Sequence, residues 1–192
     1  MRVLSSAPHK ASAITLAVTV EGEAEPRTLR ISEAEYRSLG SPGAGDILPP
    51  EAAERLLLLD ERHRARRAAA RLLEFADNNK RTLARKLRAR GFSADASADA
   101  VLYMEEKGFL REEELLERSV RASLKKLWGP KKVVAALTAR GFARDAVEEC
   151  VFRLLDGEFD IGEQKRLLLL KKGEHDPPRA RALLYRYGYD SE

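Results

Sequence analysis

A strongly basic segment occupies residues 80–92, reads KRTLARKLRARGF, and holds six cations but no acid. Its cations are Lys80, Arg81, Arg85, Lys86, Arg88 and Arg90. Guanidinium groups offer forks of hydrogen-bond donors that match the oxygens of phosphates and carboxylates. A cluster of this kind is suited to binding rather than to proton transfer. The segment therefore predicts contact with a polyanion.

Helical spacing gathers three of these arginines on one face. Leu83 and Leu87 are four residues apart and share the face turned to a core. Arg81, Arg85 and Arg88 fall on the opposite face. The simpler alternative is a solvated helix face, since arginine is a good helix former. The absence of any acid in the segment favours the binding interpretation.

A second basic cluster surrounds the sequence WGP. It consists of Lys125, Lys126, Lys131 and Lys132. Trp128 lies within this cluster and could stack on a base. A lone tryptophan beside a turn more often packs at the seam between structural units, so we expect a packing role for Trp128.

Charge is unevenly distributed along the 192 residues. Residues 1–60 hold 6 Lys or Arg against 9 Asp or Glu, residues 61–140 hold 20 against 11, and residues 141–192 hold 9 against 11. The basic character is therefore a central feature between acidic ends. A localised basic region is the usual electrostatic sign of a polyanionic partner.

The basic helix is the first of three similar segments. Residues 130–142 read PKKVVAALTARGF, and residues 177–189 read PPRARALLYRYGY. In each, a glycine follows the last helical turn, where a positive φ can end the helix. The positions of the arginine stripe become Lys131, Ala135 and Thr138 in the second copy, and Pro178, Ala182 and Tyr185 in the third. The shared residues predict a repeated scaffold, and only the first copy carries the added charge.

These patterns predict a mainly α fold, with tandem three-helix repeats in an elongated array, a small N-terminal β-hairpin/α extension and a truncated third repeat. The expected hairpin joins strands at 12–20 and 27–31. Ser32 and Glu35 have the spacing of a capping box at the start of a short helix. The three helices of the first repeat are expected at residues 79–90, 93–107 and 111–127.

The expected domain boundaries follow from the same repeat. They are 1–48 for the extension, 49–78 for a connecting helix, 79–128 for the first repeat, 129–173 for the second and 174–192 for the third. Asn78 or Asn79 would cap the first helix of the first repeat through its side-chain oxygen. Pro130 and Pro177 would open the corresponding helices of the later copies, where no amide donor is needed.

Other chemistry finds little support. The single Cys150 allows no internal disulfide and lies on an apolar stripe, so it reads as a core thiol in a reducing, cytoplasmic setting. The run Glu112–Glu114 has no His or Cys beside it and reads as a solvated face rather than a metal site. No phosphate-binding, dinucleotide or nucleophile motif is present. We therefore expect no catalytic, cofactor or metal residues, and no membrane span.

The order of signals after the basic helix is more specific. The stretch MEEKGFLREEELLERSVRASLKKLWGPKKVVAALTARGF, together with the preceding helix ending ARGF, resembles the RecX family of RecA regulators from about residue 61 onward. The resemblance implies three-helix repeats and a monomeric protein, not an enzyme, that lodges on the RecA–DNA filament. It further implies lowered RecA ATPase, strand-exchange and co-protease activity, and binding of DNA. From the charged residues themselves we expect binding of single- and double-stranded DNA to be electrostatic and independent of sequence.

A second function remains open from the residues alone. A helix-turn-helix-like DNA-binding protein or repressor, acting without RecA, would also carry a basic helix. Such a protein reads base edges with side chains such as Asn, Gln and Ser. The stripe holds only arginine, which suits contact with the phosphate backbone better.

Overall fold

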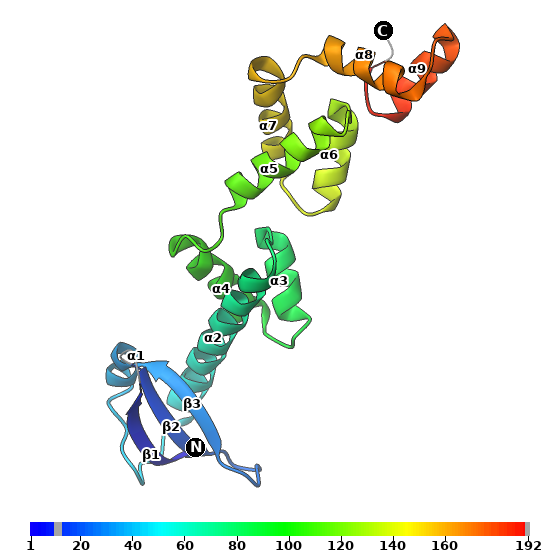
Figure 1. Cartoon of the computed structure of the whole chain (residues 1–192). Helices are drawn as coiled ribbons and strands as arrows, with labels where there is room; N and C mark the ends of the chain where they lie inside the picture. Colours follow the sequence, from blue (N-terminus) through cyan, green and yellow to red (C-terminus); the bar gives the residue numbers. More distant parts are fainter. Residues whose placement is uncertain (10–12, 191–192) are drawn as a thin grey trace. The chain divides into compact units, whose positions relative to one another are not determined.

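The structure, a computed structural model, describes residues 1–9 and 13–190. Within these residues, strands occur only before residue 33 and helices make up the rest of the regular structure (Figure 1). The chain divides into two compact units, which are Met1–Phe75 with Ala84–Phe109, and Ala76–Leu83 with Leu110–Glu192. The mainly helical fold class is confirmed.

The first unit opens with an antiparallel sheet. Its strands, in spatial order, are β1 (Arg2–His9), β2 (Ala13–Thr19) and β3 (Arg27–Ser32). Strands β2 and β3 form the expected hairpin, with Leu16 opposite Leu29, although residue 12 of the expected first strand lies outside the described residues. The expectation of two strands was incomplete, because β1 pairs with β2 along its length. Its sequence RVLSSAPH lacks the alternation that marks a strand, so pairing determines its conformation.

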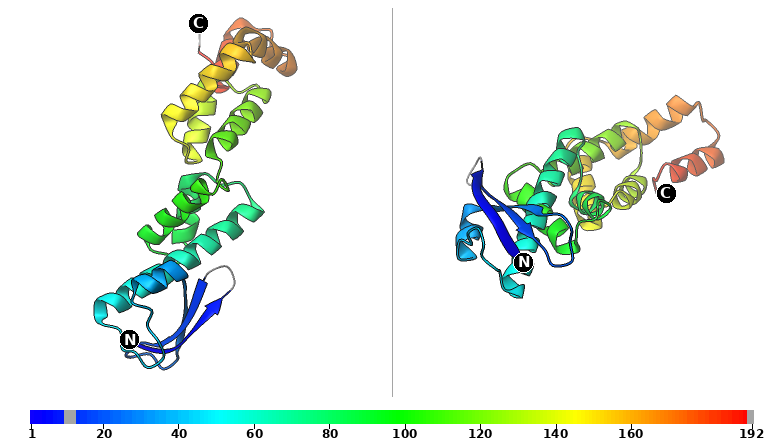
Figure 2. Two further views of the ribbon diagram at one scale, coloured as in Figure 1. Left: turned by 90° about the vertical axis from the view of Figure 1, so that its left-hand side faces the viewer. Right: turned by 90° about the horizontal axis from the view of Figure 1, so that it is seen from below.

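Helix α1 (Glu33–Ser38) follows the sheet directly. The hydroxyl of Ser32 accepts a hydrogen bond from the Glu35 amide at 3.2 Å, and the Glu35 carboxylate accepts one from the Ser32 amide at 2.7 Å. This reciprocal pair is the expected capping box. Helix α2 (Pro50–Phe75) then lies beside the sheet (Figure 2). The shared core consists of Val3, Leu16, Val18, Leu29, Ile31, Leu48, Ala53, Leu56 and Leu59.

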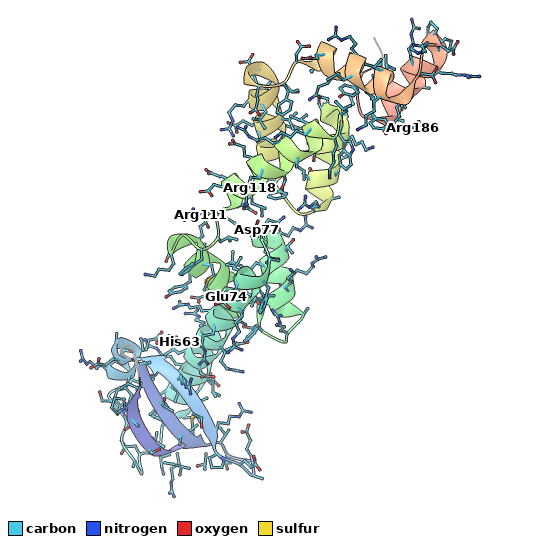
Figure 3. The ribbon with its side chains drawn as sticks, in the orientation of Figure 1. His63, Glu74, Asp77, Arg111, Arg118 and Arg186 are labelled. Atoms are coloured by element: carbon cyan, nitrogen blue, oxygen red, sulfur yellow. The ribbon has the colours of Figure 1, made fainter. Side chains whose placement is uncertain are left out.

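Polar contacts join α2 to the elements around it. The buried carboxylate of Asp60 accepts hydrogen bonds from the Arg30 amide and from Arg64 Nε, both at 2.8 Å. His63, labelled in Figure 3, lies 2.7 Å from a carboxylate oxygen of Glu35. These contacts attach the sheet and α1 to the middle of α2.

Helix α4 (Ala94–Glu106) packs along the other part of α2. Arg66 of α2 makes a two-pronged ion pair with Asp99 of α4, at 2.7 and 2.9 Å, and its guanidinium carbon lies 4.5 Å from the centre of the Tyr103 ring. The pairing with Asp99 raises the pKa of Arg66. Arg66 is thus committed to helix packing.

The second unit holds the helices that follow α4 in the chain. They are α5 (Glu112–Lys125), α6 (Pro130–Ala139), α7 (Arg144–Gly157), α8 (Ile161–Lys172) and α9 (Pro177–Arg186). Helices α5, α6 and α7 share one apolar core, formed by Leu116, Val120, Leu124, Val133, Leu137, Phe142, Val147, Cys150, Val151 and Leu154. Pro130 and Pro177 open α6 and α9 as predicted.

This packing differs from the predicted grouping of the helices into repeats. The sequence placed the third helix of the first repeat at 111–127, as a companion of the two helices before it. Helix α5 instead packs with α6 and α7, because Leu116, Val120 and Leu124 line the same core as Val133. A packing unit therefore begins one helix earlier than the sequence repeat does.

Candidate nucleic-acid interface

The basic helix α3 (Lys80–Arg88) begins at a network of buried polar groups. The Asn79 side-chain oxygen accepts a hydrogen bond from the Thr82 amide at 2.7 Å, which is the predicted cap. The Asn79 side-chain amide donates to the carbonyl oxygen of Arg140 at 2.9 Å. A carboxylate oxygen of Glu112 accepts from the Lys80 amide at 2.9 Å. The first turn of α3 is thus held by α5 and by the end of α6.

The arginine stripe lies on the exposed face of α3. Leu83 and Leu87 are fully buried, whereas Arg81, Arg85 and Arg88 are exposed, as the spacing predicts. None of the three forms an ion pair with the residues that the structure describes. The guanidiniums are therefore available to an anionic partner.

The other predicted cations of this segment flank the stripe. Arg90 lies just beyond the helix and is exposed, whereas Lys80 and Lys86 are partly buried. Arg81 also has a packing role, since its aliphatic stem covers Gly141, where a β carbon would stand 3.3 Å from Arg81 Cδ. The basic segment therefore combines an exposed charged face with residues at its edges that also pack against the rest of the protein.

Helix ends in the second unit meet head to tail. The Arg140 carbonyl, at the end of α6, accepts from Asn79 before α3. In the same way, the Tyr187 carbonyl at the end of α9 accepts from the Gly129 amide before α6 at 2.7 Å, and the Gly188 carbonyl accepts from the Lys131 amide at 3.1 Å. Where α9 meets α6, unpaired carbonyls at one helix end thus satisfy unpaired backbone donors at the next helix start. Where α6 meets α3, the donor is the side-chain amide of Asn79.

The second basic cluster lies where α5, α6 and α9 meet. Lys132 Nζ stands 4.7 Å from the centre of the Trp128 ring and 4.6 Å from that of Tyr187. Lys126 Nζ lies 5.9 Å from the centre of the Trp128 ring, and Lys172 Nζ lies 5.9 Å from the centre of the Tyr187 ring. Such contacts stabilise cations over aromatic faces. The rings of this cluster therefore hold lysines in place.

The remaining residues of that cluster differ from one another. Lys125 is exposed, and Lys131 pairs with the carboxylate of Asp190. That hydrogen bond raises the pKa of Lys131. Trp128 is partly buried against the core of α5, α6 and α7, which confirms the expected packing role.

Two residues outside the predicted basic site, Glu112 and Arg118, have structural roles. Glu112 caps α3 from 32 residues away, a contact that no local pattern indicates. Arg118 pairs with Asp77 at 3.1 Å, and both are labelled in Figure 3.

Cys150 is buried as predicted, and its burial raises the pKa of the thiol. Residues 1–9 and 13–190 contain no group of His, Cys, Asp and Glu side chains that could hold a metal ion, and no helix among them is long and apolar enough to cross a membrane.

Helix groups that repeat along the chain and meet through matched ends define an α-helical repeat protein. No protein-family model matches the chain. A relative from Pseudomonas putida, named regulatory protein RecX, is 31% identical over 125 residues, which cover 65% of this chain and 86% of the relative. A regulatory protein RecX from Caldanaerobacter subterraneus subsp. tengcongensis is 24% identical over 133 residues, covering 69% of this chain and 68% of the relative.

The fold agrees with these matches. A crystal structure of regulatory protein RecX superimposes on 99% of this chain and 95% of its own, with a TM-score of 0.71 and 12% sequence identity. The chain belongs to the RecX family of regulatory proteins.

Proposed function

We propose that this chain is a non-enzymatic regulator that binds the RecA–DNA filament as a monomer and inhibits the ATPase, recombinase and co-protease activities of RecA. Membership of the RecX family supports a regulatory role. The observation that carries the nucleic-acid part is the exposed stripe of Arg81, Arg85 and Arg88, which has no ion-pair partner among the described residues. In this proposal the stripe contacts the phosphates of the DNA.

The dimensions of the stripe suit a nucleic-acid backbone. Arg81 and Arg88 are seven positions apart, which corresponds to about 10 Å along a helix at about 1.5 Å per residue. Phosphates of one DNA strand follow one another at about 3.4 Å along the duplex axis. Three guanidiniums can therefore neutralise about three phosphates in sequence.

The composition of the stripe argues against base readout. Specific recognition needs side chains that pair with base edges, typically Asn or Gln beside Arg, whereas phosphate contacts carry no sequence information. The exposed face of α3 presents only guanidiniums between its two ends. We therefore propose that binding to single- and double-stranded DNA is electrostatic and independent of sequence. The clusters at Lys125, Lys126, Lys131 and Lys132 add positive charge to the same unit as the start of α3.

The deciding experiment measures ATP hydrolysis by RecA on single-stranded DNA, with and without this protein at stoichiometric amounts. We expect hydrolysis to fall as the protein is added. Unchanged hydrolysis, combined with strong preference for one duplex sequence in a binding assay, would instead favour a repressor that acts without RecA.

A further inference from the structure

The two head-to-tail helix contacts of the second unit have equivalent parts. Arg81 of α3 corresponds to Lys131 of α6 at the 50-residue offset, and Ala143 after α6 corresponds to Asp190 after α9 at the 47-residue offset. In both contacts a carbonyl oxygen at the end of one helix accepts a hydrogen bond from the start of the other. The contacts are therefore two copies of one joint, which we call the α6–α3 joint and the α9–α6 joint.

The two joints differ in one charge. In the α9–α6 joint, the carboxylate of Asp190 pairs with the ammonium of Lys131. In the α6–α3 joint, the position of Asp190 holds the uncharged Ala143, and Arg81 forms no ion pair with the residues that the structure describes. The residue that follows the joint thus decides whether the cation of the joint already has an anionic partner.

The residues before Asp190 are anchored to the rest of the second unit. The carbonyl oxygen of Gly188 accepts a hydrogen bond from the Lys131 amide at 3.1 Å. Tyr189 is 1% exposed, and its hydroxyl lies 3.2 Å from the side-chain oxygen of Gln164. An exposed ion pair is weakened by the cost of ordering two long side chains. Because Asp190 is short and follows anchored backbone, its carboxylate needs little further ordering to reach Lys131.

The α9–α6 joint gathers further cations. The ammoniums of Lys126, Lys132 and Lys172 lie between 4.6 and 5.9 Å from the centres of the Trp128 and Tyr187 rings. These three lysines form no ion pair with a carboxylate among residues 1–9 and 13–190. Cations gathered without acids attract phosphates. The joint thus has the charge of a nucleic-acid contact in which Asp190 covers one of the cations.

We propose that Asp190 occupies the place of a phosphate in the α9–α6 joint, and so withholds a second nucleic-acid contact until a DNA phosphate displaces it from Lys131. The inference rests on the proposed function, which takes the exposed arginines of α3 as the open contact with DNA. Carboxylate and phosphate oxygens compete for the same ammonium. The chain then has one open basic surface on α3 and one masked basic surface in the α9–α6 joint.

Two reciprocal substitutions test the mask. Asp190→Asn removes the carboxylate from the α9–α6 joint. Its control for net charge is Asp156→Asn, because Asp156 is exposed on α7 and has no ion-pair partner among the described residues. Ala143→Asp places a carboxylate in the α6–α3 joint. Its control is Ala143→Ser, because Ala143 is the N-cap residue of α7 and both substitutions supply a capping oxygen, whereas only Asp adds charge.

Affinity of the full chain for a single-stranded oligonucleotide is measured by fluorescence anisotropy across a salt series. We expect Asp190→Asn to raise affinity at low salt about two- to fivefold, as for release of an exposed ion pair. The slope of log affinity against log salt should steepen by about 0.7, as for one more phosphate. Ala143→Asp should lower affinity by a similar factor, and both controls should match the parent. In a Lys131→Gln background, Asp190→Asn should change nothing.

The outcomes separate this inference from the proposed function. An Asp190→Asn variant that binds DNA like the parent overturns the inference and leaves the proposed function standing. A gain that Asp156→Asn reproduces, or that persists in the Lys131→Gln background, does the same, since it reflects net charge alone. If thermal melts show that Asp190→Asn does not fold, equal affinities of Ala143→Asp and Ala143→Ser overturn the inference. A parent that binds no DNA overturns both this inference and the nucleic-acid part of the proposed function.

Discussion

A β carbon on Gly188 would stand 2.5 Å from the β carbon of Lys132, closer than side-chain atoms ever pack. Gly188 also has a φ of 88°, which disfavours any residue with a side chain. Its carbonyl oxygen accepts a hydrogen bond from the Lys131 amide at 3.1 Å. The carbonyl oxygen of Tyr187 accepts one from the Gly129 amide at 2.7 Å. The contact between α9 and α6 therefore depends on glycine at this position.

Substituting Gly188→Ala should weaken this contact strongly. Left-handed backbone alone costs an L residue about 1–2 kcal/mol, and displacement of Lys132 adds to that cost. We expect the free energy of unfolding to fall by more than about 2 kcal/mol, measured by urea denaturation. Gly173→Ala is the matched control, because Gly173 has a φ of 62° but an empty surrounding. Equal losses in the two variants would mean that close approach contributes nothing.

The cap at the start of α3 makes a second prediction about stability. Asn79 is 4% exposed, accepts from Thr82 and donates to Arg140. Asn79→Ala removes both bonds and should lower the free energy of unfolding by roughly 2 kcal/mol. Asn79→Ser retains a capping oxygen and should recover about half of that loss. Thermal melts of both variants beside the parent provide the measurement, and a serine variant no better than alanine would contradict the capping role.

Reversing the arginine stripe should separate function from folding. The triple variant Arg81→Glu, Arg85→Glu and Arg88→Glu replaces attraction to phosphates with repulsion. Because these side chains are exposed, the helical circular dichroism spectrum should be retained and melting should stay near the parent. Inhibition of RecA ATPase should be lost.

Two controls accompany the triple variant. One reverses Lys171, Arg181 and Arg186, which are exposed on α8 and α9, and so changes the total charge equally. The other is Lys131→Glu alone, which should have a smaller effect, because Lys131 already pairs with Asp190. If the folded stripe variant inhibits as well as the parent, the stripe is only a solvated face.

Salt should weaken DNA binding in proportion to the phosphates contacted. With about three to six phosphates, the logarithm of affinity for single strands should fall against the logarithm of salt concentration with a slope of roughly −2 to −4. Fluorescence anisotropy across a salt series measures the slope. A response independent of salt contradicts electrostatic binding.

The Glu35–His63 contact predicts a pH dependence of stability. Burial raises the pKa of Glu35, but hydrogen bonds from His63 and Ser32 outweigh it, and the folded pKa lies below the ordinary value of 4.5. The charged carboxylate therefore contributes stability above about pH 4.5, and this contribution is lost as the pH falls through the folded pKa. The stability difference between the parent and Glu35→Gln should be largest near neutral pH and shrink in acid. Urea denaturation near neutral pH and at a pH below 4.5 measures this difference. The variant Glu33→Gln is the control on the same helix.

Local patterns predicted the parts of the fold that local chemistry determines. The cap at Asn79, the prolines that open α6 and α9, and the buried face of α3 all follow from spacing within one helix. Strand β1 did not, because pairing with β2 rather than its own residues holds it. The packing of α5 also escaped prediction, since an apolar stripe does not indicate which neighbour it meets.

The candidate site shows the same division. The exposed face of α3 was predictable from helical spacing, whereas the acceptor for the Lys80 amide lies 32 residues away on α5. The pairing of Lys131 with Asp190 joins residues that are distant in sequence, so the reduced availability of this lysine could not be inferred. Contacts between distant segments decide which of the predicted cations remain available.

The head-to-tail meeting of helix ends has an electrostatic consequence. Each helix carries partial positive charge at its N-terminus and partial negative charge at its C-terminus. The negative end of α9 meets the positive end of α6, and that of α6 meets the positive end of α3, so these poles compensate one another. The C-terminal pole of α3 meets no further helix start within the described residues. Arg85, Lys86 and Arg88 stand in the last turn of α3, where cations stabilise a helix. Of the three similar helices, α3 is therefore the one whose C-terminal end itself favours positive charge.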